Sequence, residues 1–251
     1  MCARMIRVED DNGVRSILLD RPDKANALSN DMMTELADAV SGAGRAELIV
    51  VAGNGPKGFC AGADIAEFLR GPEELERQEK GIKALITAFS GASCPVIAAI
   101  HGRTLGAGVM ICCLADLVIA ADDVVMGLPE IRFNMYPVVV HAALEEKISG
   151  TLAFQLCATG RLLNGAEAQS LGLVSELLPA AGFASRLAEK IAFYRDRSAA
   201  LSIARRTMRI DGPSNILERA AKLAPLMHEN YSRPGVHETI ANYLKGIAGP
   251  R

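Results

Sequence analysis

Residues 95–108 read PVIAAIHGRTLGAG, and this stretch decides the fold class. Its first part, 95–100, is a short, continuous apolar run, which is typical of a strand buried on both faces of a parallel sheet. Residues 48–52 and 117–121 have the same character, and an amphipathic helical pattern over 72–89 lies between two of these runs. Strand, helix and strand at this spacing predict an α/β fold with a parallel sheet and helical crossovers.

The flanking segments extend this prediction along the chain. Residues 14–19 are rich in β-formers, and Ser29 fits the N-cap of a helix that reaches about Val40. Beyond Pro179 the strand signal stops, and helical patterns follow over residues 181–196, 198–210, 214–231 and 235–247. We therefore predict an α/β core over residues 1–180 and a helical C-terminal region over residues 181–251.

Composition excludes several classes of function. The chain has 251 residues, is 50% hydrophobic and 22% charged, and carries a formal net charge of −2, as an ordinary globular protein does. No dense Lys/Arg block points to nucleic acid, and the four His lack the spacing of metal ligands. The longest apolar stretch, 105–121, is too short and too polar to cross a bilayer, and the N-terminus does not read as a signal peptide. We therefore predict a cytoplasmic protein with no nucleic acid or membrane partner and no metal.

The six Cys include no C-x-x-C pair. This pattern predicts buried, reduced thiols. Cys60 lies in a glycine-rich loop, where a nucleophilic role is the alternative, although no activating base is adjacent in sequence.

Two glycine-rich segments carry the candidate chemistry: residues 58–65, GFCAGADI, and residues 101–108, HGRTLGAG. Small residues let the backbone approach a ligand closely, and N–H groups at a helix start lack intrahelical partners. Asp64 suits the positive end of a helix dipole. One N–H from each segment, meeting at one point, would hold a thioester oxygen as it gains negative charge. Tight turns with structural glycines are the alternative, and the spacing does not match a dinucleotide-binding fingerprint.

Over essentially its full length the chain resembles the enoyl-CoA hydratase/isomerase (crotonase) superfamily. The order and spacing of several motifs carry this resemblance: residues 20–28 (DRPDKANAL), 59–65 (FCAGADI), 95–102 (PVIAAIHG), 105–108 (LGAG), Asp116, 128–131 (LPEI), 159–161 (TGR) and 166–179. The resemblance implies a crotonase-like spiral of repeated ββα units and a helical C-terminal region that mediates trimerisation, as a homotrimer or a dimer of trimers. It also implies an acyl-CoA thioester substrate, with coenzyme A as part of that substrate and no other cofactor.

Position by position, the resemblance implies roles for individual residues. The oxyanion-hole N–H groups belong to Ala63 and Ala107, and Glu130 in the LPEI motif is the acid/base. The residues expected beside the adenine and pantetheine of coenzyme A are Lys24, Ala25, Ala27, Ala61, Asp64 and Ile65.

The chain departs from the pattern of the superfamily's hydratases at one decisive position. Those hydratases generally carry two glutamates that hold one water, and the first maps to Met110, which cannot transfer a proton. After Pro137, three valines and His141 replace the usual glycine-rich turn. We therefore expect Met110, Val138 and His141 to line a narrowed acyl pocket, and we expect this apolar setting to raise the pKa of Glu130.

A single glutamate favours double-bond isomerisation of an enoyl-CoA, because one group can remove a proton at C2 and return it at C4. Hydration of an unusual acyl-CoA, or another lyase reaction, is the alternative, with His141 or Tyr136 as a candidate for the second proton. A weakly catalytic CoA-thioester binding protein is the third hypothesis.

Overall fold

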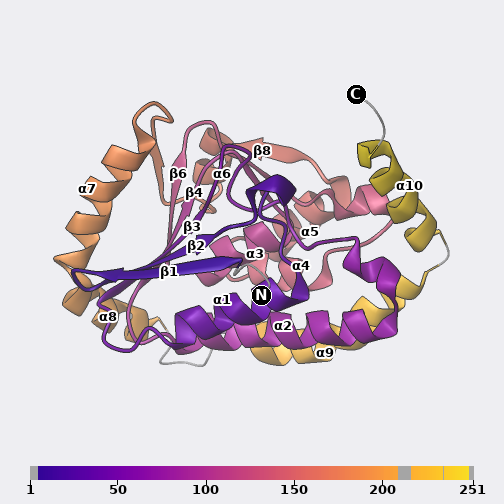
Figure 1. Cartoon of the computed structure of the whole chain (residues 1–251), viewed down its shortest axis with the longest axis horizontal. Coiled ribbons are helices and arrows are strands. Elements are labelled where there is room, and N and C mark those ends of the chain that lie inside the picture. The colour runs from indigo at the N-terminus through magenta and orange to yellow at the C-terminus, as the bar shows by residue number, and fades with distance from the viewer. Residues whose placement is uncertain (1–4, 209–215, 234, 249–251) are drawn as a thin grey trace.

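The computed structural model describes residues 5–208, 216–233 and 235–248. A six-stranded sheet forms its centre, in the order β1 (Ile6–Asp11), β2 (Val14–Leu19), β3 (Leu48–Gly53), β4 (Val96–Ile100), β6 (Leu117–Ala121) and β9 (Glu176–Leu178). From β2 to β9 all neighbours are parallel, whereas β1 pairs antiparallel with β2 (Figure 1). The predicted parallel sheet with helical crossovers is confirmed.

The central strands are apolar because both faces of the sheet are covered. All five residues of β4 are buried. On one face the strands pack against α1 (Asn30–Ser41) and α2 (Pro72–Gly91) in the main core. On the other face they pack against α7 (Phe183–Arg195) through Phe183, Leu187 and Ile191. The two helical layers therefore enclose a dry sheet.

Local sequence signals set the ends of the first helices. The Met32 N–H donates to the Ser29 side-chain oxygen at 3.2 Å, so Ser29 caps α1 as predicted. Pro72 occupies the first turn of α2, where its missing N–H costs no helical bond. On the buried face of α2, Gln78 follows Leu75 and precedes Ile82, which places a polar side chain in an apolar stripe.

A second, three-stranded sheet consists of β5 (Arg103–Leu105), β7 (Val125–Gly127) and β8 (Leu162–Asn164). The chain passes from β4 to β5 and then into α3 (Ala107–Leu114), and from β6 to β7 and then into α4 (Val138–Leu144). Each unit thus places one strand in each sheet before a helix, which is the predicted spiral of ββα units. The remaining short elements are 3₁₀ helices η1 (Pro22–Lys24), η2 (Glu67–Arg70) and η3 (Pro129–Phe133), and helices α5 (Gly150–Thr159) and α6 (Gly165–Ser170).

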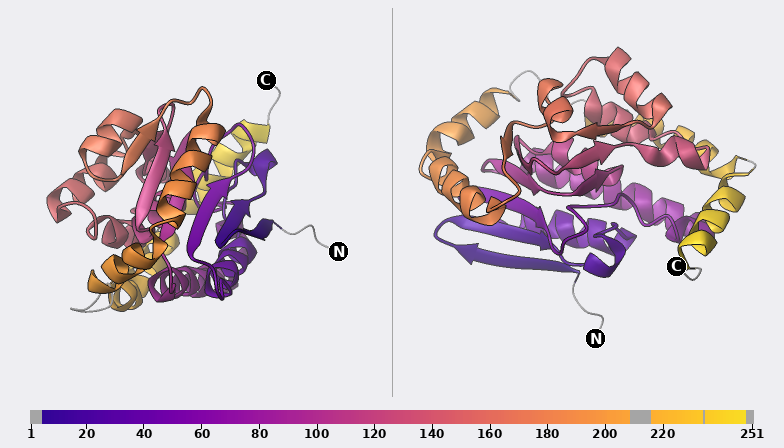
Figure 2. Two further views of the ribbon diagram at one scale, coloured as in Figure 1. Left: turned by 90° about the vertical axis from the view of Figure 1, so that its left-hand side faces the viewer. Right: turned by 90° about the horizontal axis from the view of Figure 1, so that it is seen from above.

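The C-terminal helices occupy three different places. While α7 and α8 (Ser198–Thr207) lie at one end of the molecule, α9 (Ile216–Ser232) runs beside α2, and α10 (Val236–Ala248) lies at the opposite end (Figures 1 and 2). Val236 and Ile240 of α10 pack against Phe68 of η2. The predicted helical character of residues 181–251 is confirmed for the described part, and residues 209–215 lie outside it. The boundary at residue 180 and trimerisation stay predictions.

Candidate active site

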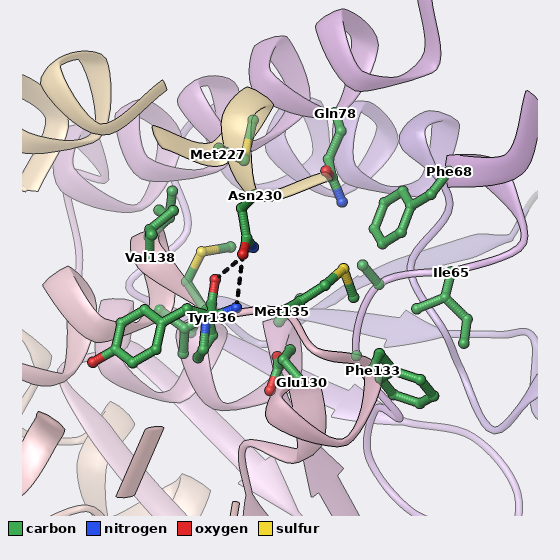
Figure 3. Close-up of a pocket in the computed structure, with 18 of the residues that line it drawn as sticks. Ile65, Phe68, Gln78, Glu130, Phe133, Met135, Tyr136, Val138, Met227 and Asn230 are labelled. Atoms are coloured by element: carbon green, nitrogen blue, oxygen red, sulfur yellow. Dashed lines mark hydrogen bonds between the residues drawn. The ribbon is translucent and has the colours of Figure 1, made fainter. Parts of the chain in front are cut away.

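Both glycine-rich segments meet the LPEI motif at one pocket of about 110 Å³ (Figure 3). One wall comes from these loops, η3 and the start of α4, and the other from α2 and α9. The predicted site residues that line it are Ala61, Ala63, Ile65, Ala107, Met110, Glu130 and Val138. The fold thus gathers seven positions that are far apart in the sequence.

Glu130 lines this pocket from η3, and its carboxyl group is buried. Its Oε2 is buried and has no hydrogen-bond partner among the described residues. Burial raises the pKa of Glu130 to about 7, as expected for a carboxylate that is poorly solvated. A group with this pKa exists in both protonation states near neutral pH, so it can both accept and return a proton.

The other carboxyl oxygen lies against the second glycine-rich segment. A Cβ atom at Gly106 would lie 2.5 Å from Glu130 Oε1, so only glycine leaves room for the carboxylate there. Gly106 also has a positive φ of 49° and is the N-cap of α3, which begins with Ala107. The same glycine therefore leaves room for the Glu130 carboxylate and adopts the backbone conformation that begins α3.

The two candidate oxyanion-hole amides have no partner within the described residues. The Ala107 N–H is the first of α3 and finds no intrahelical acceptor, and the Ala63 N–H donates no hydrogen bond either. The segments are adjacent, since a Cβ atom at Gly62 would lie 3.8 Å from the Ala107 nitrogen. Two unpaired N–H groups on the wall of one pocket are the donors that a developing oxyanion requires.

Asp64 does not lie at the start of a helix, contrary to the expectation for this residue. Ala63 forms an isolated parallel bridge with Leu28, and the next helix, η2, begins only at Glu67. The Asp64 carboxylate is 2.7 Å from Arg21 Nη1 and accepts the Ala66 N–H at 3.2 Å. Asp64 therefore fixes the turn through an ion pair and a local hydrogen bond, rather than through the dipole of a helix.

Of the residues expected beside coenzyme A, only Ala61 and Ile65 line the pocket. Lys24 is exposed, and Lys24, Ala25, Ala27 and Asp64 lie outside the pocket. The loop around them is nevertheless held beside the site, because the Ala61 N–H donates to the Ala25 carbonyl at 3.0 Å. Their contact with coenzyme A stays a prediction.

Asn26 fixes this loop and was not among the predicted site residues. Its fully buried amide donates to the carbonyls of Asn54, at 2.9 Å, and Gly58, at 3.0 Å. Its Oδ1 accepts the Arg21 N–H at 2.9 Å. Asn26 thereby ties the loop before α1 to the first glycine-rich segment.

His141 does not line the pocket, contrary to the expectation for this residue. In α4, Val138, Val139 and Val140 line the pocket, whereas the His141 ring lies behind Tyr136. The Tyr136 hydroxyl and His141 Nδ1 are 2.5 Å apart, and His141 Nε2 is 3.5 Å from Glu145 Oε1. The helix turn after the valines carries the ring away from the site.

Three polar lining residues come from helices that the sequence does not connect with the site: Gln78 of α2, and Asn230 and Tyr231 of α9. Asn230 Oδ1 accepts the Tyr136 N–H at 3.1 Å, and Asn230 Nδ2 donates to the Tyr136 carbonyl at 3.0 Å (Figure 3). Gln78 carries a signal, because it interrupts an apolar stripe. No such signal marks the two α9 residues.

Cys60 is excluded as a nucleophile by its surroundings. The thiol is fully buried, and burial raises the pKa of Cys60 to about 12. Cys60, Cys94, Cys112, Cys113 and Cys157 are all buried free thiols, as predicted, and Cys2 lies outside the described residues. No group of three or more His, Cys, Asp or Glu side chains in the described part of the chain is placed to hold a metal ion.

Comparison with known proteins gives a consistent answer. The chain matches the family described as Enoyl-CoA hydratase/isomerase over residues 9–243. It is 31% identical over 184 residues to a crotonyl-CoA hydratase of Syntrophomonas wolfei, which covers 71% of this chain and 70% of that relative. It is also 31% identical over 190 residues to a peroxisomal Delta(3,5)-Delta(2,4)-dienoyl-CoA isomerase of Arabidopsis thaliana, which covers 69% of this chain and 68% of that relative.

A further relative is longer than the matched region. The chain is 36% identical over 172 residues to enoyl-CoA hydratase domain-containing protein 2 of Bos taurus, and the match covers 65% of this chain but only 57% of that protein. Among solved structures, an enoyl-CoA hydratase from Mycobacterium avium subsp. paratuberculosis superposes with a TM-score of 0.86, at 22% identity and over 96% of each chain. In the described residues, no helix is both long and apolar enough to span a membrane. From the family match, the relatives and the shared fold, we conclude that this chain belongs to the enoyl-CoA hydratase/isomerase family.

Proposed function

We propose that this chain is an enoyl-CoA isomerase that moves a double bond from the 3- to the 2-position of an acyl-CoA thioester. The observation that carries this proposal is the solitary Glu130. It has the only carboxylate among the described residues that line the pocket, and no Lys, Arg or His lines it. Met110, where a second glutamate would be expected, is buried beside it on the pocket wall.

The reaction begins when the ionised Glu130 carboxylate removes a proton from C2 of the 3-enoyl thioester. The electron pair of the broken C–H bond delocalises over the double bond and the thioester carbonyl, which gives a dienolate. The Ala63 and Ala107 N–H groups hold the negative oxygen, and each such donor contributes about 3 kcal/mol in related acyl chemistry. The protonated Glu130 then returns its proton at C4, which leaves the double bond between C2 and C3. The reaction is redox-neutral and needs no cofactor beyond the coenzyme A of the substrate.

Hydration is the second candidate, and the name of the Syntrophomonas wolfei relative supports it. Adding water needs a base for the water and an acid for the α-carbon. The other titratable groups on the pocket wall are the phenols of Tyr136 and Tyr231, and burial raises the pKa of both. The Tyr136 hydroxyl also points away from Glu130 (Figure 3). The raised pKa of both phenols makes them weaker acids and so disfavours them as the second acid.

The experiment is incubation with 3-hexenoyl-CoA and, separately, with 2-butenoyl-CoA, followed by the absorbance of the conjugated thioester. Isomerisation predicts rising absorbance with the first substrate and no change with the second. Falling absorbance with 2-butenoyl-CoA would identify a hydratase instead. Tight binding of both thioesters without turnover would leave the CoA-thioester binding protein as the function.

A further inference from the structure

Asn230 of α9 is bonded to the backbone of another residue of the pocket wall. Its side chain is 7% exposed and lines the pocket. Its amide accepts the Tyr136 N–H and donates to the Tyr136 carbonyl, so both hydrogen bonds go to the backbone of one residue (Figure 3). A buried amide is unfavourable unless it is paired in this way, and the proposed proton transfer gives Asn230 no role.

Tyr136 lies in the short segment that joins the helix of Glu130 to the helix of the valines. Residues 134–137 connect the end of η3 with the start of α4. Within this segment the Met135 N–H donates to the Glu130 carbonyl at 3.2 Å, and the Val138 N–H donates to the Tyr136 carbonyl at 2.9 Å. The backbone that Asn230 holds is therefore bonded to the first residue of α4 and is adjacent to the bond that holds the main chain of Glu130.

The helix that carries Asn230 gives it a fixed base. Met227, one turn earlier in α9, is buried in the main core. The Tyr136 N–H has no acceptor among the described residues except Asn230 Oδ1, so loss of this bond leaves a backbone donor unpaired. A second contact between the same two segments, from Arg233 Nη2 to Asn134 Oδ1 at 3.1 Å, is exposed, and water can replace it. The buried pair is thus the stronger connection of the two.

We infer that Asn230 is a positioning residue for Glu130: by binding the Tyr136 backbone to α9, it holds residues 134–137 in place, and with them the Glu130 carboxyl group. This inference rests on the proposed function, since it takes Glu130 as the group that moves the proton. Asn230 itself transfers no proton, because an amide side chain does not titrate in the physiological range.

Asn230→Ala removes both hydrogen bonds and keeps α9, since alanine has the highest helix propensity. We expect kcat for 3-hexenoyl-CoA to fall about 10²-fold, the loss typical of a reacting group displaced by about an ångström. The Kd of hexanoyl-CoA, which lacks the double bond and does not react, should change by less than about threefold, because the two glycine-rich segments stay in place. A lower Tm with wild-type kcat would mean that Asn230 only supports the fold, and would overturn the inference.

Two further variants complete this experiment. Asn230→Leu keeps the size of the side chain without its hydrogen bonds and should lose kcat as Asn230→Ala does; if one of the two does not fold, the other decides. Arg233→Met removes the exposed contact between the same two segments and should retain wild-type kcat and Kd. An equal loss of kcat in Arg233→Met would overturn the specific role of Asn230.

A second readout needs no turnover. Burial raises the pKa of Glu130 to about 7, and displacement of residues 134–137 would admit water to its carboxyl group. In a carbon-13 NMR titration, with Glu130→Gln to identify the signal, the pKa of Glu130 should fall toward 4.5 in both Asn230 variants. The other titratable groups on the described pocket wall are the phenols of Tyr136 and Tyr231, whose pKa values burial raises, so they stay neutral during this titration. An unchanged pKa of Glu130 in both variants would overturn the inference.

The same data separate this inference from the proposed function. A lowered pKa of Glu130 in the Asn230 variants, without turnover of 3-hexenoyl-CoA by the wild-type protein, would sink the isomerase proposal and leave the positioning role standing. Turnover by the wild-type protein, with kcat and the pKa of Glu130 unchanged in the variants, would do the reverse.

Discussion

The Glu130 carboxylate occupies the space that a side chain at Gly106 would need: a Cβ atom on the glycine would lie 2.5 Å from the Oε1 atom of the glutamate. The glycine also takes a positive φ of 49° and leads directly into Ala107, whose N–H has no partner in the described residues. The candidate base and one candidate oxyanion donor are therefore positioned by the same backbone atoms. Any change at Gly106 acts on both.

Gly106→Ala should disable the site without unfolding the protein. The added methyl group must displace the Glu130 carboxylate, and the positive φ adds about 1–3 kcal/mol of backbone strain. We expect kcat for 3-hexenoyl-CoA to fall about 10²-fold, the typical loss for a reacting group misplaced by about an ångström. Gly91→Ala is the control, because a Cβ atom there would meet nothing within 4 Å. Equal activity in the two variants would show that the close contact has no catalytic consequence.

The pH dependence of kcat/KM should report the ionisation of Glu130. Burial raises its pKa to about 7, and proton removal at C2 needs the ionised form. We expect kcat/KM to rise about tenfold per pH unit below this pKa and to level off above it. A plateau that extends unchanged down to pH values near the ordinary pKa of 4.5 would mean that another group is the base.

The same pKa shift has a consequence for stability. Below pH 4.5 the Glu130 carboxyl is protonated in both the folded and the unfolded chain; as pH rises from there toward 7, the unfolded chain releases the proton first. The folded state therefore loses up to about 3 kcal/mol over this window relative to a chain without the carboxyl. Glu130→Gln should match the wild type in acid and exceed its free energy of unfolding above pH 7. Chemical denaturation at several pH values measures this difference, and a pH-independent difference would contradict a buried, poorly solvated carboxylate.

Much of the fold could be predicted from single segments of sequence. The buried strands β3, β4 and β6 appear as continuous apolar runs because both faces of the sheet are covered. Strand β1 escapes this criterion, since it is an edge strand with only Ile6 buried. Its signal is the Asn12-Gly13 turn, in which both residues take positive φ and join β1 to β2 as a tight hairpin.

The candidate site, like the fold, could be predicted from the sequence only in part. Glu130, Ala63, Ala107 and Met110 lie in motifs whose order and spacing carry the family resemblance. The sequence does not indicate that α9 lies against α2, because an amphipathic pattern shows that a face is buried but not which element covers it. Asn230 and Tyr231 therefore emerge only from the structure. The prediction that His141 lines the pocket was wrong for a related reason: the sequence does not determine which face of α4 is turned toward the pocket.

Restoring a carboxylate at residue 110 should change the reaction. In Met110→Glu, a second acid/base group would stand on the pocket wall with Glu130, and we expect hydration of 2-butenoyl-CoA to rise by about 10²-fold. The variant should also be less stable, because the Met110 side chain is 1% exposed and a carboxylate there is buried. Met110→Gln, which cannot transfer a proton, is the matched control. A folded Met110→Glu protein with no gain over this control would show that the valine-lined pocket, and not the missing glutamate, prevents hydration.

The most direct test of the central claim is the turnover of 3-hexenoyl-CoA by Glu130→Gln. If Glu130 alone carries the proton from C2 to C4, the rate should fall by about 10³-fold or more, at the upper part of the range for loss of a general acid/base. Glu146→Gln, at an exposed glutamate outside the pocket, should retain wild-type turnover. Unchanged isomerisation by a folded Glu130→Gln protein would contradict the account.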